Sequence, residues 1–212
     1  MYVPRFNALD DAAAIRAMVT GIGSAELVTV GEDGYPLATR LPVVWDGDRL
    51  VFHIARANPH WRSVPVEESV AALAVVTDAE AYVSPGWYAT KAEHGRVVPT
   101  WNYSAVQITG RLRRVEDPAW LREAVTMLTD QHEAARAERW AVTDAPATYV
   151  DKQLRAIVGL ELAIERVEGK AKLSQNRSEE DRAGVVRGLR AEGAAREAVM
   201  ADQMERLLEG LP

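Results

Sequence analysis

Two large aromatic side chains alternate with two small hydrogen-bonding ones at residues 100–103, in the order Thr-Trp-Asn-Tyr. From Val106 onward the same stretch alternates apolar and polar residues, as a half-buried strand does. A plain strand needs no such cluster at its start. Flat rings beside amide and hydroxyl groups are suited to holding a flat molecule that is apolar in the middle and polar at its edge.

Four further clusters place hydrogen-bonding or cationic side chains beside an aromatic ring or a strand end. They are ATRLP (38–42), FHIARANPHW (52–61), YVSPGWYATK (82–91) and KLSQNR (172–177). Arg56 follows the end of a predicted strand, where a guanidinium can reach an anion that backbone amides also support. A ligand suited to the whole set is flat, polar at its ring edge and phosphorylated at a tail. Flavin mononucleotide (FMN) has these properties.

Each cluster taken alone also has a purely structural explanation. Buried tryptophans and tyrosines commonly fill cores and form local hydrogen bonds. Arg56 alone could be half of a surface ion pair, and His53 alone a satisfied histidine in a strand. The four histidines lack metal-ligand spacing, and we find no P-loop, no GxGxxG turn and no hydrolase serine elbow. We therefore expect no metal site and identify no catalytic residue.

The elements that would position these clusters are a β meander and several helices. An opening helix is predicted over residues 7–23, with Asn7 as its N-cap and Gly21 or Gly23 at its end. Two prolines, Pro36 and Pro42, indicate that one strand lies at a sheet edge or contains a bulge. The predicted strands cover residues 25–30, 35–45, 49–55, 70–77, 79–88, 98–117 and 158–173. The apolar run at 70–77 is typical of a strand buried on both faces.

The second half of the chain adds helices. One is predicted from Asp117 as N-cap with Pro118 at its first position, and the segment 143–157 opens another. In the last strand, Glu161 should face away from its apolar neighbours. Residues 178–211 are charged and alanine-rich, which predicts one or two surface helices.

The fold class expected is α+β, mainly β, with a closed or nearly closed antiparallel sheet of six or seven strands and peripheral helices. We divide the chain into a main domain over 1–177 and a helical extension over 178–212, packed on the barrel or on a dimer partner.

Composition excludes several classes of protein. The 212 residues are 48% hydrophobic and 26% charged, as in a globular protein. No apolar run approaches eighteen residues, and the acidic N-terminal region does not resemble a signal peptide, so we expect a cytoplasmic protein without a membrane span. The absence of cysteine excludes disulfides, thiolate zinc sites and cysteine nucleophiles. A net charge of −6 argues against a large nucleic-acid interface, and Arg111 and Arg113 are expected on a solvated sheet face.

Five segments together resemble the FMN-binding negative transcriptional regulators of the PaiB type. They are MYVPRFN (1–7), HIARANPHW (53–61), YVSPGWY (82–88), VPTWNY (98–103) and the segment 157–185, and the resemblance extends to about residue 190. It implies the FMN-binding split β-barrel, a fold shared with the pyridoxamine-phosphate oxidase-like flavoproteins. It also implies a homodimer with the flavin at the subunit interface.

The resemblance carries over to individual positions. It assigns the flavin phosphate to Arg56, helped by His53 and Asn58 in the segment that also holds Ile54 and Ala55. It places Thr39, Arg40 and Leu41 along the polar edge of the ring. The pocket would be lined from the dimer side by Thr100, Trp101, Asn102 and Tyr103, and closed by Lys172, Gln175, Asn176 and Arg177.

This chain departs from the family pattern at two positions. Many relatives carry histidine where this chain has Arg40 and Gln107, so family chemistry that depends on those imidazoles is in doubt here. Arg40 would instead add a permanent positive charge and favour an anionic flavin.

Three functions stay open from the sequence. The first is a flavin-dependent sensor that regulates transcription without tight direct DNA binding. The second is a flavin-dependent oxidoreductase in which the cofactor carries the chemistry. The third is a haem-binding protein with His53 or His94 as the axial ligand.

Overall fold

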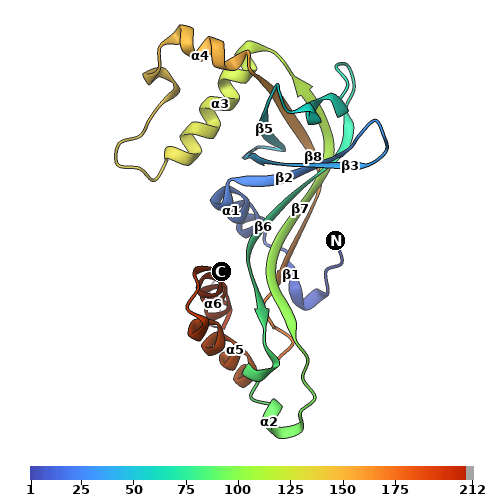
Figure 1. Cartoon of the computed structure of the whole chain (residues 1–212), viewed down its shortest axis with the longest axis vertical. Helices are drawn as coiled ribbons and strands as arrows, with labels where there is room; N and C mark the ends of the chain where they lie inside the picture. The colour runs from blue at the N-terminus through green and yellow to red at the C-terminus, as the bar shows by residue number, and fades with distance from the viewer. Residues whose placement is uncertain (209–212) are drawn as a thin grey trace. The chain divides into compact units, whose positions relative to one another are not determined.

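The computed structural model describes residues 1–208, which form an antiparallel sheet and flanking helices. The sheet has eight strands in the order β3-β2-β6-β7-β8-β5-β4, and the short β1 pairs with β8 (Figure 1). The strands are β1 (Ala8–Leu9), β2 (Ser24–Val30), β3 (Pro36–Pro42), β4 (Val44–Asp46), β5 (Arg49–Ala55), β6 (Val70–Val83), β7 (Thr100–Val115) and β8 (Ile157–Lys172). The predicted antiparallel sheet is confirmed, with eight strands in place of the six or seven expected.

The described residues also form six α-helices and four short 3-10 helices. The α-helices are α1 (Ala12–Ile22), α2 (Lys91–His94), α3 (Pro118–Glu133), α4 (Ala147–Leu154), α5 (Glu179–Glu192) and α6 (Ala195–Leu208). The 3-10 helices are η1 (Arg5–Asn7), η2 (Pro59–Ser63), η3 (Pro85–Trp87) and η4 (Val142–Asp144). Helix α3 begins as predicted, since the Asp117 side chain accepts a hydrogen bond from the Trp120 amide at 2.9 Å.

The chain divides into two compact units. Unit 1 consists of residues 1–15, 77–106 and the described residues from 168 onward, and unit 2 consists of residues 16–76 and 107–167. The long strands β6, β7 and β8 each contribute one segment to each unit. The domain boundary expected between residues 177 and 178 stays a prediction.

Unit 2 buries one face of its strands. In β7, Ile108 and Leu112 are fully buried while Arg111 and Arg113 alternate outward, as predicted. Phe52 and Leu50 of β5 join this core. Strand β3 lies at a sheet edge with a proline at each end, which confirms the reading of those prolines.

The opening helix starts later than predicted. Helix α1 begins at Ala12, and the Asp11 side chain accepts from the Ala13 amide at 2.8 Å, so Asn7 is not its N-cap. Asn7 is instead buried in η1. The reason lies in β1, because Ala8 and Leu9 pair with β8 and keep the backbone extended. The helix ends as expected, since Gly23 has φ of +64°.

Two strand predictions are also corrected. The strand expected at 70–77 and the first part of the one expected at 79–88 form one continuous strand, β6, because no glycine or proline interrupts the chain before Pro85. The rest of the second prediction is wrong, since residues 85–87 form η3. The expectation of burial on both faces is wrong for β6, where Ala72, Ala74 and Val76 are buried and alternate with more exposed residues. The opposite face carries Ala71, Leu73 and Val75, of which Leu73 and Val75 are only half-buried.

Glu161 faces away from Leu160 and Leu162 as expected, yet it is buried. Its carboxylate oxygens accept hydrogen bonds from Arg49 at 2.7 Å and Arg113 at 2.8 Å. Burial by itself would raise the pKa of Glu161, but the hydrogen bonds from the two arginines outweigh it and lower the pKa. Arg113 is therefore an ion-pair partner on a partly covered face of the sheet.

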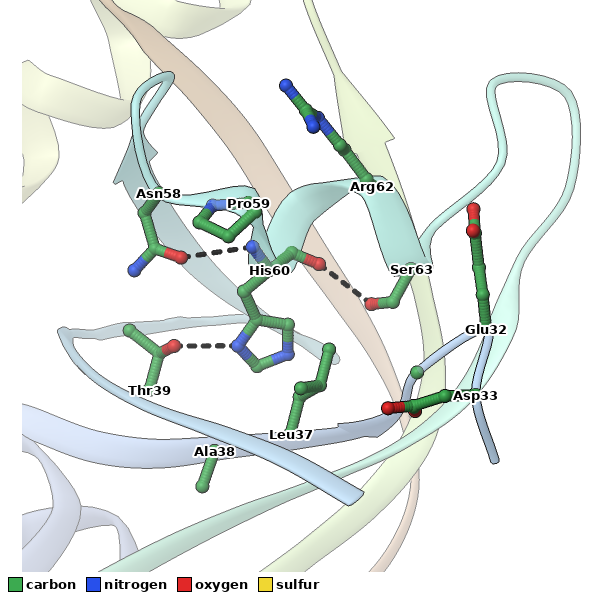
Figure 2. Close-up of a pocket in the computed structure, with 11 residues that line it drawn as sticks. Glu32, Asp33, Leu37, Ala38, Thr39, Asn58, Pro59, His60, Arg62 and Ser63 are labelled. Atoms are coloured by element: carbon green, nitrogen blue, oxygen red, sulfur yellow. Dashed lines mark hydrogen bonds between the residues drawn. The ribbon is translucent and has the colours of Figure 1, made fainter. Parts of the chain in front are cut away.

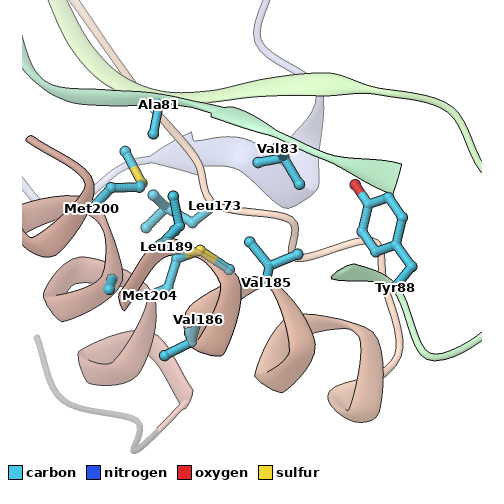
Figure 3. Close-up of a cluster of buried hydrophobic side chains, with 10 residues drawn as sticks. Ala81, Val83, Tyr88, Leu173, Val185, Val186, Leu189, Met200 and Met204 are labelled. Atoms are coloured by element: carbon cyan, nitrogen blue, oxygen red, sulfur yellow. The ribbon is translucent and has the colours of Figure 1, made fainter. Parts of the chain in front are cut away.

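Unit 1 has its own hydrophobic core, to which α5 and α6 contribute (Figure 3). Val185 and Leu189 of α5 and Met200 and Met204 of α6 pack with the end of β6. The two helices are thus partly buried, beyond the surface role expected of them; residues 209–211 of that prediction lie outside the described residues.

Helix α5 approaches η3 closely through two glycines. A Cβ at Gly184 would lie 2.1 Å from the carbonyl oxygen of Trp87, and a Cβ at Gly188 would lie 2.2 Å from its indole ring. Only hydrogen-sized side chains fit against this tryptophan.

Candidate functional site

A pocket of about 630 Å³ lies beside η2 in unit 2 (Figure 2). It is lined from the β2–β3 turn, from β3 and from η2, and we call it the η2 pocket. The lining residues are Gly31, Glu32, Asp33, Leu37, Ala38, Thr39, Asn58, Pro59, His60, Arg62 and Ser63. Its volume falls in the range of roughly 300–1,000 Å³ typical of small-molecule sites.

The sequence Asn-Pro-His builds the wall of this pocket. The Asn58 side-chain oxygen accepts from the His60 amide at 3.0 Å, which caps η2, and Pro59 occupies its first turn. Because the oxygen of Asn58 is used by the cap, its amide nitrogen is the end left for another partner. Among the described residues this nitrogen has no acceptor.

His60 is the centre of a hydrogen-bond chain. It is only 4% exposed, and its Nδ1 lies 2.7 Å from the Thr39 hydroxyl while its Nε2 lies 2.9 Å from the Thr29 hydroxyl. The Thr29 hydroxyl in turn lies 2.8 Å from that of Ser63, which donates to the His60 carbonyl at 2.8 Å. Burial lowers the pKa of His60, so the ring is neutral at pH 7.

These contacts fix the proton positions. The Ser63 hydroxyl donates its proton to the His60 carbonyl. Thr29 must therefore be the donor in the Thr29–Ser63 hydrogen bond. The Nε2 atom of His60 must then donate to Thr29, which leaves Nδ1 to accept from Thr39. The chain therefore holds η2 against both β2 and the edge strand β3.

Charged groups occupy separate parts of the η2 pocket. Glu32 and Asp33 lie together on the turn, away from Asn58 and Thr39 (Figure 2). Arg62 is exposed at the rim, and within residues 1–208 its one partner is the Trp61 ring, 5.6 Å from the guanidinium carbon. Arg62 and the Asn58 amide are thus donors that the protein leaves available for an anion.

Arg56, the residue predicted to bind phosphate, already has partners. Its guanidinium pairs with Glu116 at 2.8 Å and donates to the carbonyls of Arg155 at 3.2 Å and Ile157 at 3.3 Å. It lines a different pocket, of about 470 Å³, beside α3 and α4. An anion would have to compete with a carboxylate for this side chain.

The other predicted residues of unit 2 lie in several places. Thr39 and Asn58 meet at the η2 pocket. Leu41 and Ile54 are buried in the core, and Arg40 is exposed, where it pairs with Glu26 at 3.2 Å. The remaining two, His53 and Ala55, line a third pocket on the other face of β5 from Ile54.

Alternation along β7 divides the Thr-Trp-Asn-Tyr cluster of unit 1 between two faces. Asn102 is fully buried, whereas Trp101 is exposed beside Tyr82 and the guanidinium of Arg196. Tyr103 shares the face of Trp101, and the amine of Lys170 lies 5.0 Å from its ring centroid. The four side chains cannot all line one side of a pocket.

The KLSQNR segment meets that cluster because β7 and β8 are neighbours. Lys172 donates to the Thr100 hydroxyl at 2.5 Å and also to the Trp101 carbonyl, and Asn102 bonds Ser174 at 3.0 Å. Burial and the charge of Lys170 lower the pKa of Lys172.

The remaining residues of the segment form its turn and rim. Gln175 closes the turn at Ser174, which has φ of +64°, by accepting from the Leu173 amide at 2.7 Å. Asn176 is exposed, and the guanidinium of Arg177 stacks 4.6 Å from the Tyr88 ring centroid.

Sequence reasoning missed His60 and Arg62 as site residues. Both lie in the segment Asn58–Val64, which the sequence predicts as a short helical turn, but no local signal showed that this turn borders a pocket.

Comparison with known proteins identifies the family. The chain belongs to the family described as "Putative FMN-binding domain", whose model matches residues 1–166. The chain is 31% identical to the "Protease synthase and sporulation protein PAI 2" of Bacillus subtilis, over 99% of each chain. The predicted family is confirmed, and FMN, the expected cofactor, is the one that the family description names.

Solved structures confirm the fold. A FAD- and haem-binding protein from Mycobacterium smegmatis superposes with a TM-score of 0.59 and 22% identity, over 82% of this chain and 77% of that one. The flavocytochrome Anf3 from Azotobacter vinelandii gives 0.58 and 19%, over 86% and 78%. The split-barrel class predicted from sequence is therefore correct.

The described residues contain neither a metal-binding cluster nor a membrane-spanning helix. No group of histidine, aspartate and glutamate side chains within residues 1–208 is arranged to hold a metal ion. No helix in that range is long and apolar enough to cross a membrane.

Proposed function

We propose that this chain binds FMN with the phosphate held in the η2 pocket. The observation that carries the proposal is the pair of donors at Asn58 and Arg62, which flank His60 and have no acceptor within residues 1–208. A phosphate needs charge-assisted donors, and Arg62 and the Asn58 amide are donors that both line this pocket. The residues present thus fit the phosphate end of the cofactor.

In this proposal Arg62, in place of Arg56, meets the phosphate. The hydrogen-bond chain through His60 positions the donors, since it fixes η2 against Thr39 of β3. Glu32 and Asp33 would repel a dianion, which favours the Asn58 side of the pocket. When bound, the flavin would supply redox chemistry that the protein side chains lack.

Titration of the apo-protein with FMN, riboflavin and FAD tests the cofactor assignment. We expect FMN to bind more tightly than riboflavin, which lacks the phosphate. The affinity for FMN should also exceed that for FAD, because no glycine-rich turn is present to bind a pyrophosphate. Equal affinities for FMN and riboflavin would rule out a phosphate site, and the absorbance spectrum of the purified protein distinguishes flavin from haem.

We infer that the flavin makes the protein a sensor in gene regulation, read by a protein partner. Support comes from the relative whose name refers to protease synthesis and sporulation. The net charge of −6 opposes approach to DNA. Mobility-shift assays across a salt series should give no competitor-resistant complex with the DNA upstream of the gene.

Rapid turnover of a reduced nicotinamide with the flavin-loaded protein would instead favour an oxidoreductase.

We also propose a homodimer. Exposed aromatic side chains in unit 1, namely Trp101, Tyr82 and Phe6, are the kind that interfaces bury. Light scattering should give twice the chain mass, and the mass of a single chain would contradict the proposed dimer.

A further inference from the structure

The third pocket in unit 2, of about 430 Å³, has a lining unlike that of the η2 pocket. It lies against β5, α3, η4 and α4, and apolar side chains such as Val125, Val142 and Val150 form much of its wall. None of its lining residues is aspartate, glutamate, lysine or arginine. We call it the His53 pocket, after the one imidazole that lines it.

His53 has unused hydrogen-bonding capacity. Neither of its ring nitrogens has a partner among the described residues, and its Nδ1 is buried from solvent. Leaving such an atom unpaired destabilises the folded protein. Burial also lowers the pKa of His53, so the ring is neutral at pH 7 and has one donor and one acceptor nitrogen. A ligand in the pocket can reach the other ring nitrogen, Nε2, which has no partner among the described residues and is not fully buried.

Two aromatic side chains of the same pocket are left half exposed. Trp140 is 49% exposed and Tyr149 is 56% exposed, although both line the pocket. The Trp140 amide donates to Glu133 at 3.2 Å, which fixes the backbone of this segment at the end of α3. Flat rings beside an apolar wall gain most when another flat ring covers them.

We propose that the His53 pocket binds a small, uncharged aromatic molecule that carries a hydroxyl or a ring N–H. The polar group bonds to the His53 imidazole, and the ring packs against Trp140 and Tyr149. The uncharged lining disfavours a phosphate or a carboxylate, since a buried charge here would have no counter-ion. The site is therefore distinct from the one proposed for FMN and does not depend on it.

Calorimetric titration with 2-naphthol tests this proposal, with naphthalene and 2-naphthoate as matched probes. Naphthalene lacks the hydroxyl, and 2-naphthoate carries a charge. We expect saturable binding of 2-naphthol at one site per chain, with at least tenfold weaker binding of the other two. The titration is made with and without FMN, and we expect the same affinity in both, which separates this site from the η2 pocket.

Variants complete the test. His53→Leu should weaken 2-naphthol binding about tenfold, to the level of naphthalene, and Trp140→Ala should weaken both. The control is His94→Gln, which changes an exposed histidine in unit 1. If His53→Leu does not fold, the ¹⁵N shifts of His53 in the wild-type protein must respond to 2-naphthol. No saturable binding, or equal binding by the His53→Leu protein, would overturn the proposal.

Discussion

The Nδ1 atom of His60 lies 2.7 Å from the hydroxyl of Thr39, and this contact joins η2 to the edge strand β3. An edge strand has a neighbour on one side only, so side-chain contacts of this kind help to hold it. The same contact sets the position of two residues, Asn58 and Arg62, that the proposed function requires.

Replacing Thr39 by valine should expose the importance of this contact. Thr39→Val leaves Nδ1 of a buried imidazole without a donor, which should lower the free energy of unfolding by about 1–2 kcal/mol. The affinity for FMN should fall as well, because the same contact positions Asn58 and Arg62. Urea denaturation measures the loss, and Thr39→Ser, which keeps the hydroxyl, serves as the control. Equal stability of the Val and wild-type proteins would contradict the assigned hydrogen bond.

Stability should fall as the pH is lowered below the ordinary histidine pKa of 6.5. Burial lowers the pKa of both His53 and His60 in the folded state, so the unfolded chain binds more protons in this range. Each histidine contributes stability above pH 6.5, and this falls by up to about 1.4 kcal/mol per pH unit below it. Denaturation between pH 7.5 and 5 measures the slope of the unfolding free energy against pH. The His60→Gln variant should have a shallower slope. An unchanged slope in that variant would show that His60 is not a buried neutral group.

The carboxylate of Glu161 should be a major contributor to stability in unit 2. Glu161→Gln removes its charge between Arg49 and Arg113 and should cost about 2 kcal/mol. Because the pKa of Glu161 is lowered, its contribution is present above the ordinary value of 4.5 and is lost as the pH falls further. Glu165→Gln, at an exposed position of the same strand, is the control for thermal denaturation. Similar losses from both variants would mean that the arginine pairs add nothing.

A glycine-to-alanine change should have opposite effects on protein stability in α5 and in α1. Gly188→Ala places a Cβ against the Trp87 ring and should destabilise the protein by about 2 kcal/mol. Gly21→Ala in α1 meets nothing within 4 Å and should stabilise by up to about 1 kcal/mol through helix propensity. Thermal denaturation gives both values. A stabilised Gly188→Ala protein would show that α5 does not pack on Trp87 as described.

Those features of the fold that depend on interactions between residues near in sequence could be predicted from local sequence patterns. The alternation in β7, the Asp117 cap and the edge position of β3 follow from side-chain period, capping chemistry and the missing amide of proline. Family resemblance added the fold class.

Long-range pairing accounts for most of what the sequence could not predict. Arg56 meets Glu116, sixty residues away, and Arg113 meets Glu161. Nothing in the local sequence of Arg56 distinguishes an arginine paired in this way from one free to bind phosphate. Likewise the role of His60 depends on Thr29 and Thr39, which only the pairing of β2 with β3 brings near it.

The affinities of FMN and riboflavin for the Arg62→Gln and Arg56→Gln proteins test the central claim most directly. If the phosphate lies in the η2 pocket, Arg62→Gln should raise the dissociation constant of FMN at least tenfold, or about 1.4 kcal/mol, and leave that of riboflavin unchanged. Arg56→Gln should lower stability, because it removes an ion pair and two hydrogen bonds, but should keep the preference for FMN. The opposite result, with the preference lost in Arg56→Gln and kept in Arg62→Gln, would contradict the proposed site and assign the phosphate to Arg56.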